Sequence, residues 1–167
     1  STLGSGTLHI ELGTWGANQA SFTPKAGATA VDVSIAAGDT LEVVRDKINA
    51  AGAGVTALVM TDASGSRLLL RSNASGAANG FRTSGVAALA FDPSSGASAL
   101  TQSQKAADAA ATVNGLPVTS TSNTLSNIVD GLTLNLSAVT TAPVTVNVVT
   151  DTDALKKMIT DFAAAYT

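Results

Sequence analysis

The chain opens with an alternation of apolar and polar positions. Residues 7–12 read TLHIEL, which places Leu8, Ile10 and Leu12 on one face. A period of two residues predicts a strand with one buried face. The β pattern continues at Phe22 to Pro24 and then at 31–35, so we expect further strand in this part of the chain.

A helix is predicted after these strands. Asp39 is a suitable N-cap, and Glu42 three residues later completes an Asp version of the capping box. Apolar residues then recur at helical spacing, and they are Leu41, Val44, Ile48 and Ala51. Gly52 stands where a C′ glycine would end the helix.

A hairpin is predicted after the helix. Two apolar runs, 54–60 (GVTALVM) and 67–71 (RLLLR), flank a Gly-bearing turn at residues 62–65. The stretch from the first strand to this hairpin therefore predicts a β-β-α-β-β unit.

The following residues, 73–110, are dense in Ser, Ala and Gly, with turn signals at Asn79-Gly80 and Pro93. We expect a short strand at 89–91 and either a helical turn or a polar connector at 99–110.

A second unit of the same kind is predicted further on. Residues 112–118 read as a hairpin about Asn114-Gly115, and a short capped helix is expected over 123–131. Alternating strands at 132–137 and 144–148 complete the unit. Asp39-Thr40-Leu41 matches Asn123-Thr124-Leu125 in sequence, so an internal duplication is a hypothesis.

The C-terminal part predicts a helix beginning near Asp151 and Asp153, whose charges suit a helix N-terminus. One face carries an apolar stripe, namely Leu155, Met158, Ile159, Phe162 and Tyr166. No C-cap precedes the last residue, so we expect a helix that continues in a longer protein. Such a stripe needs a partner surface, because an isolated helix of this length is marginal in water.

The predicted fold class is α+β, mainly β: two sequential β-β-α-β-β-like units followed by the start of a stalk helix. The expected domains are 1–92, a connector at 93–105, a second β-rich unit at 106–150 and the start of a helical leg at 151–167. In the alternative, the region centred on 30–105 is inserted into a domain made from both ends of the chain.

The apolar faces also predict the core. In the first unit we expect burial of Leu8, Ile10, Val33, Ile35, Leu41, Val44, Ile48, Val55, Val59, Leu68 and Leu70. In the second unit we expect burial of Leu125, Ile128, Leu132, Leu134, Val144 and Val146.

Composition narrows the class of function. Only 13% of residues are charged, the net charge is −3, and Lys and Arg are scattered, with Lys156-Lys157 as the one adjacent pair. Nucleic acid is therefore not an expected partner, because phosphate binding needs clustered positive charge. No apolar run approaches the ~18 residues of a membrane span, and residues 1–6 lack the features of a Sec signal peptide.

Few residues are candidates for catalysis or metal binding. The chain has no cysteine and one histidine, His9, which we expect to be a solvated imidazole on the polar face of a strand. Asp62 and Ser64 lack the further ligands of a calcium loop, so a hairpin turn is the expected structure. No nucleophile, base and orienting group come together in the sequence. We expect no catalytic residue, no metal site and no cofactor.

Several segments of the sequence resemble known protein families. Residues 31–72 resemble the flagellin IN motif, with its hallmarks at 38–41, Ile48-Asn49-Ala50-Ala51, 54–57 and 67–72. Residues 112–167 contain TVNGLPVTSTSNTLSNIVDGLTLNLSAV, PVTVNVVTD and DALKKMITDFAAAYT. These segments, with the opening GTLHIELGTW, resemble the central domains of the bacterial flagellar filament-capping proteins, the hook-associated protein 2 family.

The resemblance implies a structural, non-enzymatic role at the extracellular tip of the bacterial flagellum. It implies that the central domains form an outward-facing plate, that the protein is a homo-oligomer with other cap subunits, and that it assists flagellin assembly. It also implies export by the flagellar secretion apparatus, and adhesion to host mucin or glycan in some members.

Two alternatives stay open at this point. One is another hook-associated or flagellin-like protein with the same motif. The other is a carbohydrate-binding adhesin module in which Trp15 stacks on a sugar, although a single Trp after a strand more often fills a small core.

Overall fold

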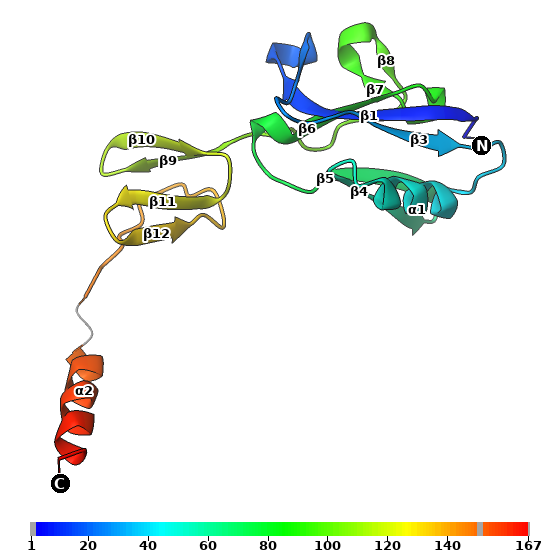
Figure 1. The fold of residues 1–167 in the computed structure, drawn as a ribbon. Coiled ribbons are helices and arrows are strands. Elements are labelled where there is room, and N and C mark those ends of the chain that lie inside the picture. Colours follow the sequence, from blue (N-terminus) through cyan, green and yellow to red (C-terminus); the bar gives the residue numbers. More distant parts are fainter. Residues whose placement is uncertain (1–2, 150–151, 167) are drawn as a thin grey trace. The chain divides into compact units, whose positions relative to one another are not determined.

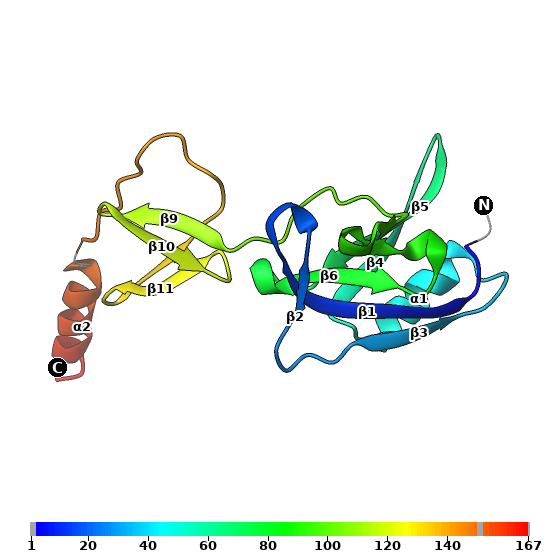
Figure 2. The ribbon, with the colours of Figure 1, turned by 90° about the horizontal axis from the view of Figure 1, so that it is seen from above.

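The computed structural model describes residues 3–149 and 152–166, and it divides into two compact units. The larger unit extends to Ser137 and the smaller one begins at Ala138. The larger unit contains a first lobe, made by β1 to β8, and a second lobe, made by β9 to β12 (Figures 1 and 2). No helix of the described residues is long and apolar enough to cross a membrane.

An antiparallel sheet forms one layer of the first lobe. Its central strand β1 pairs with β2 and β3 along one edge and with β6 along the other, and β7 and β8 extend the sheet beyond β6. The strands are β1 (Gly6–Trp15), β2 (Phe22–Pro24), β3 (Val31–Ile35), β6 (Gly80–Ser84), β7 (Phe91–Asp92) and β8 (Ala97–Ser98).

A helix and a hairpin form the second layer beneath this sheet (Figure 1). They are α1 (Leu41–Ala51), β4 (Val55–Asp62) and β5 (Gly65–Ser72), and β4 and β5 make a two-stranded sheet of their own. The predicted order of elements in this lobe is therefore confirmed as far as Ser72.

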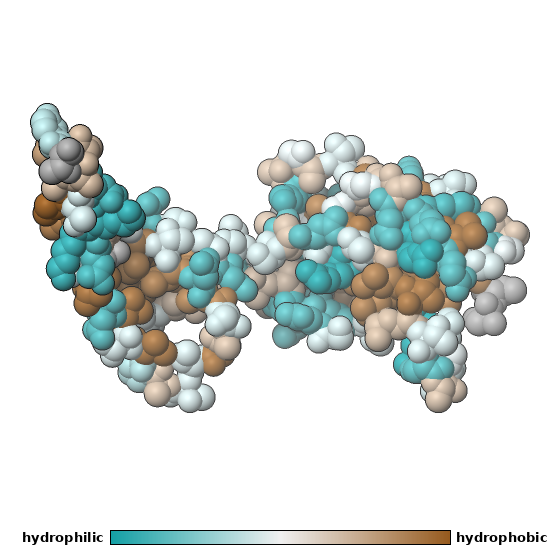
Figure 3. Space-filling view, turned by 90° about the horizontal axis from the view of Figure 1, so that it is seen from below, coloured by the Kyte–Doolittle hydropathy of each residue, from teal (hydrophilic) through white to brown (hydrophobic). Residues whose placement is uncertain are grey.

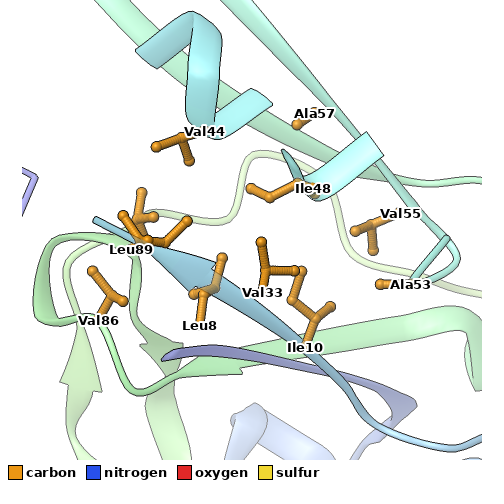
Figure 4. Close-up of a cluster of buried hydrophobic side chains, with 11 residues drawn as sticks. Leu8, Ile10, Val33, Val44, Ile48, Ala53, Val55, Ala57, Val86 and Leu89 are labelled. Atoms are coloured by element: carbon orange, nitrogen blue, oxygen red, sulfur yellow. The ribbon is translucent and has the colours of Figure 1, made fainter. Parts of the chain in front are cut away.

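The hydrophobic core lies between the two layers. Figure 4 shows side chains from β1, β3, α1 and β4 converging there, together with Val86 and Leu89. Of the predicted core, seven residues are buried, and they are Leu8, Ile10, Val33, Ile35, Val44, Ile48 and Val55. The others, Leu41, Val59, Leu68 and Leu70, are only partly buried. Three of these lie on the hairpin, whose far end extends past the helix.

The start of α1 corrects one prediction. The N-cap is Thr40, whose hydroxyl accepts a hydrogen bond from the Val43 N–H, and Asp39 lies one position earlier. Asp39 instead accepts hydrogen bonds from the Ala36 N–H (2.8 Å) and from the Lys47 ammonium (2.5 Å). The sequence analysis missed Thr40 as the N-cap, and these two hydrogen bonds engage the Asp39 carboxylate outside the helix start. Gly52 ends the helix in the left-handed conformation, as predicted.

Asn49 joins α1 to the hairpin. Its side-chain amide donates to the Ala57 carbonyl (3.0 Å), and its carbonyl oxygen accepts from the Ala57 N–H (2.7 Å). Ala57 is fully buried, and among the described residues the edge of β4 that bears these groups has no neighbouring strand. Buried backbone groups require hydrogen-bond partners. The Asn49 side chain therefore forms the two hydrogen bonds that a neighbouring strand would otherwise form with Ala57.

Residues 73–108 contain more structure than the sequence predicted. Strand β6 was missed, because Asn79-Gly80 indicated only a turn. The short strand expected at 89–91 lies at Phe91–Asp92, after a 3-10 turn at Ala87–Leu89. Residues 99–108 contain no helix or strand, so the polar connector is the correct alternative for them.

The second lobe consists of two hairpins. They are formed by β9 (Ala109–Val113) with β10 (Leu116–Ser120), and by β11 (Thr124–Val129) with β12 (Leu132–Asn135). The first turns at Asn114-Gly115, as predicted, and both residues have the positive φ of a type I′ turn.

The helix expected over 123–131 is wrong, because that stretch is strand β11. Asp130-Gly131, which we interpreted as a helix end, turns β11 into β12, and Asn127 bulges with φ 60°. The duplication hypothesis fails with it, since α1 has no counterpart in the second lobe. Leu125 is buried as predicted, but Ile128, Leu132 and Leu134 are only half-buried.

The strand expected at 144–148 is also wrong. This segment has no regular structure, and Val144 and Val146, predicted to be buried, are exposed. Alternation indicates that a segment suits a strand, but a strand also needs a neighbour to complete its hydrogen bonds. Among the described residues, no strand pairs with this one.

The C-terminal helix is confirmed as α2 (Thr152–Ala164). The whole predicted stripe is exposed within its own unit. Asp153 lies in the first turn, as expected, while Asp151 falls outside the described residues.

The fold class, α+β and mainly β, is confirmed. The proposed domain boundaries and the inserted-domain alternative stay predictions.

Replacing Ile48 with Ala should destabilise the first lobe by about 2–5 kcal/mol, because the fully buried side chain leaves a cavity between the layers. Chemical denaturation would measure the loss. Val43→Ala on the exposed side of the same helix is the control, and it should change stability by less than about 0.5 kcal/mol. Equal effects of the two substitutions would contradict the placement of this helix face.

Replacing Asn49 with Ala should cost about 1–3 kcal/mol, because it removes both partners of the Ala57 backbone. Amide hydrogen exchange should show faster exchange at Ala57. Asn49→Asp keeps the acceptor but loses the donor, so its unfolding free energy should lie between those of wild type and Asn49→Ala. An unchanged exchange rate at Ala57 in the Ala variant would show that the bridge is dispensable.

The stability of the chain should depend on pH through Asp39. The hydrogen bond from Lys47, and then that from Ala36, hold the pKa of Asp39 below its ordinary value. A carboxyl whose pKa is lower in the folded state contributes stability above its unfolded pKa, about 3.9, and loses it as pH falls through the folded value. Wild type should therefore exceed Asp39→Asn in stability at neutral pH, with a gap that closes on acidification. A gap independent of pH would refute this role.

Candidate interaction surfaces

The single histidine is paired across two strands. His9 on β1 lies opposite Asp32 on β3, and its Nδ1 contacts the Asp32 carboxylate. Both side chains are substantially exposed. The sequence analysis placed His9 correctly on the polar face but missed Asp32, because cross-strand register brings together residues far apart in the chain.

Trp15 is a core residue of the first lobe. It is only 6% exposed, its indole N–H donates to the Phe81 carbonyl (3.0 Å), and its ring packs edge-on against Phe22 and Phe91. The interpretation of Trp15 as a small-core residue is confirmed. The ring has no free face on which a sugar could stack.

Arg82 links the strands around this tryptophan. Its guanidinium contacts the Glu11 carboxylate (2.7 Å) and the Asp92 carboxylate (3.6 Å), and it lies 4.8 Å from the centre of the Phe22 ring. One guanidinium thus contacts two carboxylates, and it donates a hydrogen bond to Glu11. The arrangement holds β1, β6 and β7 together.

The remaining acidic candidates are explained by local structure. The Asp62 carboxylate accepts from the Ser64 N–H (2.7 Å) and so shapes the hairpin turn, as expected. Glu42 lies in the first turn of α1, where bonds from its own N–H and from Thr40 lower its pKa. Within the described part of the chain, no three His, Asp or Glu side chains are grouped to hold a metal ion. The expectation of no catalytic residue stays a prediction.

A shallow groove of about 590 Å³ runs beside β5. It is lined by residues 68–76 and 100–107, with Phe81 and Phe91 also contributing. Its side chains bring together no acid, base and nucleophile.

Large apolar side chains are exposed at several places. They include Leu58, Met60 and Leu69 on the hairpin, Leu116 and Val129 in the second lobe, and the stripe of α2. Exposed apolar patches of this kind typically mark interaction sites. The sequence analysis identified the α2 stripe but missed the outer face of the hairpin. The run Leu68-Leu69-Leu70 was the available signal, because a strand cannot bury three successive side chains on one face.

Comparison with known proteins gives two family matches. Residues 17–74 match a family described as the flagellin hook IN motif. Residues 106–167 match one described as the flagellar hook-associated protein 2 C-terminus. The first match contains Ile48 and Asn49, which form the core and the bridge described above.

A curated relative covers nearly the whole chain. The B-type flagellar hook-associated protein 2 of Pseudomonas aeruginosa is 35% identical over 181 residues, which cover 97% of this chain. The same alignment covers 36% of the relative, so the chain spans about a third of that protein.

Solved structures of flagellar cap proteins are similar to this chain in sequence and fold. A crystal structure of FliD (HAP2) from Pseudomonas aeruginosa PAO1 is 32% identical, with a TM-score of 0.72 over 97% of this chain and 74% of the other. The D1-D2-D3 domains of the Escherichia coli flagellar cap protein FliD are 29% identical, with a TM-score of 0.74 over 99% of this chain and 47% of the other. On this sequence identity and coverage, the chain belongs to the FliD family of flagellar cap proteins, also called hook-associated protein 2.

Proposed function

We propose that this chain forms part of the outward-facing plate of a bacterial flagellar filament cap. The observation that carries the proposal is the match to FliD from Pseudomonas aeruginosa, in which sequence and fold agree along 97% of the chain. In this role the chain acts at the extracellular tip of the flagellum as a structural, non-enzymatic component. Its partners are other cap subunits and flagellin, and the flagellar secretion apparatus exports it.

The exposed apolar stripe of α2 supports the assignment of this helix to a part of the protein separate from the plate. Burying each large apolar side chain is worth about 1.5–3 kcal/mol, and five such side chains are exposed on this helix and the turn after it. A helix with this much unburied surface suits packing against further helices. We assign residues 151–167 to the start of a helical leg, and 1–92 and 106–150 to the plate, with 93–105 as connector.

The surface chemistry suits assembly better than adhesion. Trp15 was the residue on which a carbohydrate-binding module would depend, and it is buried and hydrogen-bonded. No other Trp exists in the chain, and its single Tyr lies beyond α2. Binding to mucin or glycan therefore forms no part of the proposal.

A chimeric cap would test the function. In a Pseudomonas aeruginosa strain lacking its own hook-associated protein 2, we would express that protein with its matched segment replaced by this chain. We expect filaments to form and flagellin to stay attached, because the plate is restored. Electron microscopy and the amount of flagellin in the medium measure this.

A version with the segment deleted is the matched control, and it should release flagellin into the medium. Immunoblotting of exported chimera separates a protein that is absent from one that fails to cap. An exported, soluble chimera that leaves all flagellin in the medium would overturn the proposal.

A further inference from the structure

Strand β5 has an open edge. In an antiparallel ladder, successive residues turn their N–H and C=O groups alternately toward the neighbouring strand and away from it. Asn49 binds both groups of Ala57, so these groups point away from β5, and the Ala57–Leu70 pair is not hydrogen-bonded. The N–H and C=O of Leu70 therefore point away from β4, and the unbroken register gives Leu68 the same orientation.

These outward backbone groups have no partner within the described residues. There β5 pairs with β4 alone, and no hydrogen bond from elsewhere in the described chain reaches Leu68 or Leu70. Both residues line the groove beside β5. A free strand edge is a template for another strand, and an extended peptide that adds to such an edge is a common mode of recognition.

The second segment that lines the groove is held at both of its ends. The Leu100 N–H donates to the Ala90 carbonyl (3.1 Å), and the Asp108 carboxylate accepts from the Ala77 N–H (2.7 Å). Residues 101–107 between these anchors contain no helix or strand. The groove is therefore preformed, and its volume of about 590 Å³ is in the usual range of ligand sites.

The charge in the groove is positive. Arg71 and Lys105 are the charged residues that line it, and neither forms an ion pair within the described part of the chain. An acidic partner is therefore favoured. A second copy of β5 is a poor partner, because two such strands side by side would bring together the like charges of Arg67 and Arg71.

The outer face of the hairpin defines the side chains that suit this partner. Leu69 and Arg71 lie two residues apart and therefore on the same face of β5. Leu69 is 42% exposed, and hydrophobic residues gather next to the projecting hairpin tip in Figure 3. A strand added to β5 would place alternate side chains beside Leu69 and Arg71. An apolar and an acidic residue two positions apart would match them.

We propose that the groove beside β5 binds an extended, acidic segment of another polypeptide, which adds to β5 as a further strand. The backbone of the segment pairs with Leu68 and Leu70, its apolar side chain covers Leu69, and its carboxylate meets Arg71. A peptide suits the site better than an acidic glycan, because a peptide offers N–H and C=O groups at the spacing of a strand. The site is an addition to the cap function and does not depend on it.

A synthetic peptide tests the pairing on the 167-residue chain. The probe has about six residues, the usual length of a strand, with valine and aspartate two positions apart among threonines. Binding should slow hydrogen exchange at the amides of Leu68 and Leu70, which gain acceptors. Exchange at Leu69 should not change, because its N–H already bonds to β4.

Two N-methylated forms of the probe test whether the backbone makes the contact. Methylation of the alternate amides that face β5 should weaken binding about tenfold or more, because it removes donors and adds bulk at the edge. Methylation of the other alternate amides, which face away from β5, is the matched control and should leave the affinity unchanged.

Charge reversal tests the preference for an acidic partner. Arg71→Glu should lower the affinity for the aspartate probe by about two- to fivefold, the range that an exposed ion pair supplies. It should raise the affinity for a probe with lysine in place of aspartate by a similar factor. Arg45→Glu on α1, outside the lining of the groove, is the control and should change neither affinity. Thermal unfolding of both variants checks that the fold is intact.

Equal binding of the two methylated probes, or an unchanged preference in Arg71→Glu, would overturn the proposal. Oligogalacturonate, an acidic sugar chain, is the competing ligand. If it binds at the same amides more tightly than the aspartate probe, the groove is a glycan site and the proposal is wrong. Protection of Leu68 and Leu70 in a dimer without any probe would assign the edge to a second copy, which also contradicts the proposal.

Discussion

The edge of β4 sets the architecture of the first lobe. A two-stranded hairpin is marginally stable alone, and within the described part of the chain β4 pairs with β5 alone. Asn49 satisfies the backbone of Ala57 on the other side, with one donor and one acceptor from the same amide. Because Ile48 precedes it and is fully buried, consecutive residues fix the helix to the core and to the hairpin at once.

Fixing the hairpin at its base has a consequence at its tip. The half of the hairpin near Ala57 packs under α1, while the half near Asp62 extends beyond the helix with both faces less covered. The apolar side chains of the outer face are held in fixed register by eight cross-strand pairs. A surface of this kind is preorganised, so less conformational entropy is lost when a partner binds.

The polar side chains of the first lobe also hold its strands in place. Arg82 contacts two carboxylates and lies against the ring of Phe22, which packs in turn on Trp15, whose N–H is also satisfied. Among the described residues no buried side-chain polar atom lacks a partner. His9, Trp15 and Arg82 thus use their polar groups to connect neighbouring strands.

The sequence by itself determined the elements whose signals are local. The alternation at β1 and β3, the stripe and C′ glycine of α1, the Asn114-Gly115 turn and the stripe of α2 all follow from short-range periodicity or backbone preference. For the same reason the sequence predicted most of the core between the sheet and α1. The resemblance to the filament-capping family also rested on contiguous segments and agreed with the relatives found.

Tertiary structure decided whatever depends on a distant partner. Lys47 and Ala36 donate hydrogen bonds to Asp39, and Thr40 caps the helix. The cross-strand register places Asp32 beside His9. The backbone of Ala57 forms both hydrogen bonds of the Asn49 side chain. Residues 123–131 were interpreted as a capped helix, but Thr124–Val129 pairs with β12 and is a strand. Residues 144–148 have the alternation of a strand but no neighbour among the described residues, because a sequence pattern specifies a face and not the element that covers it.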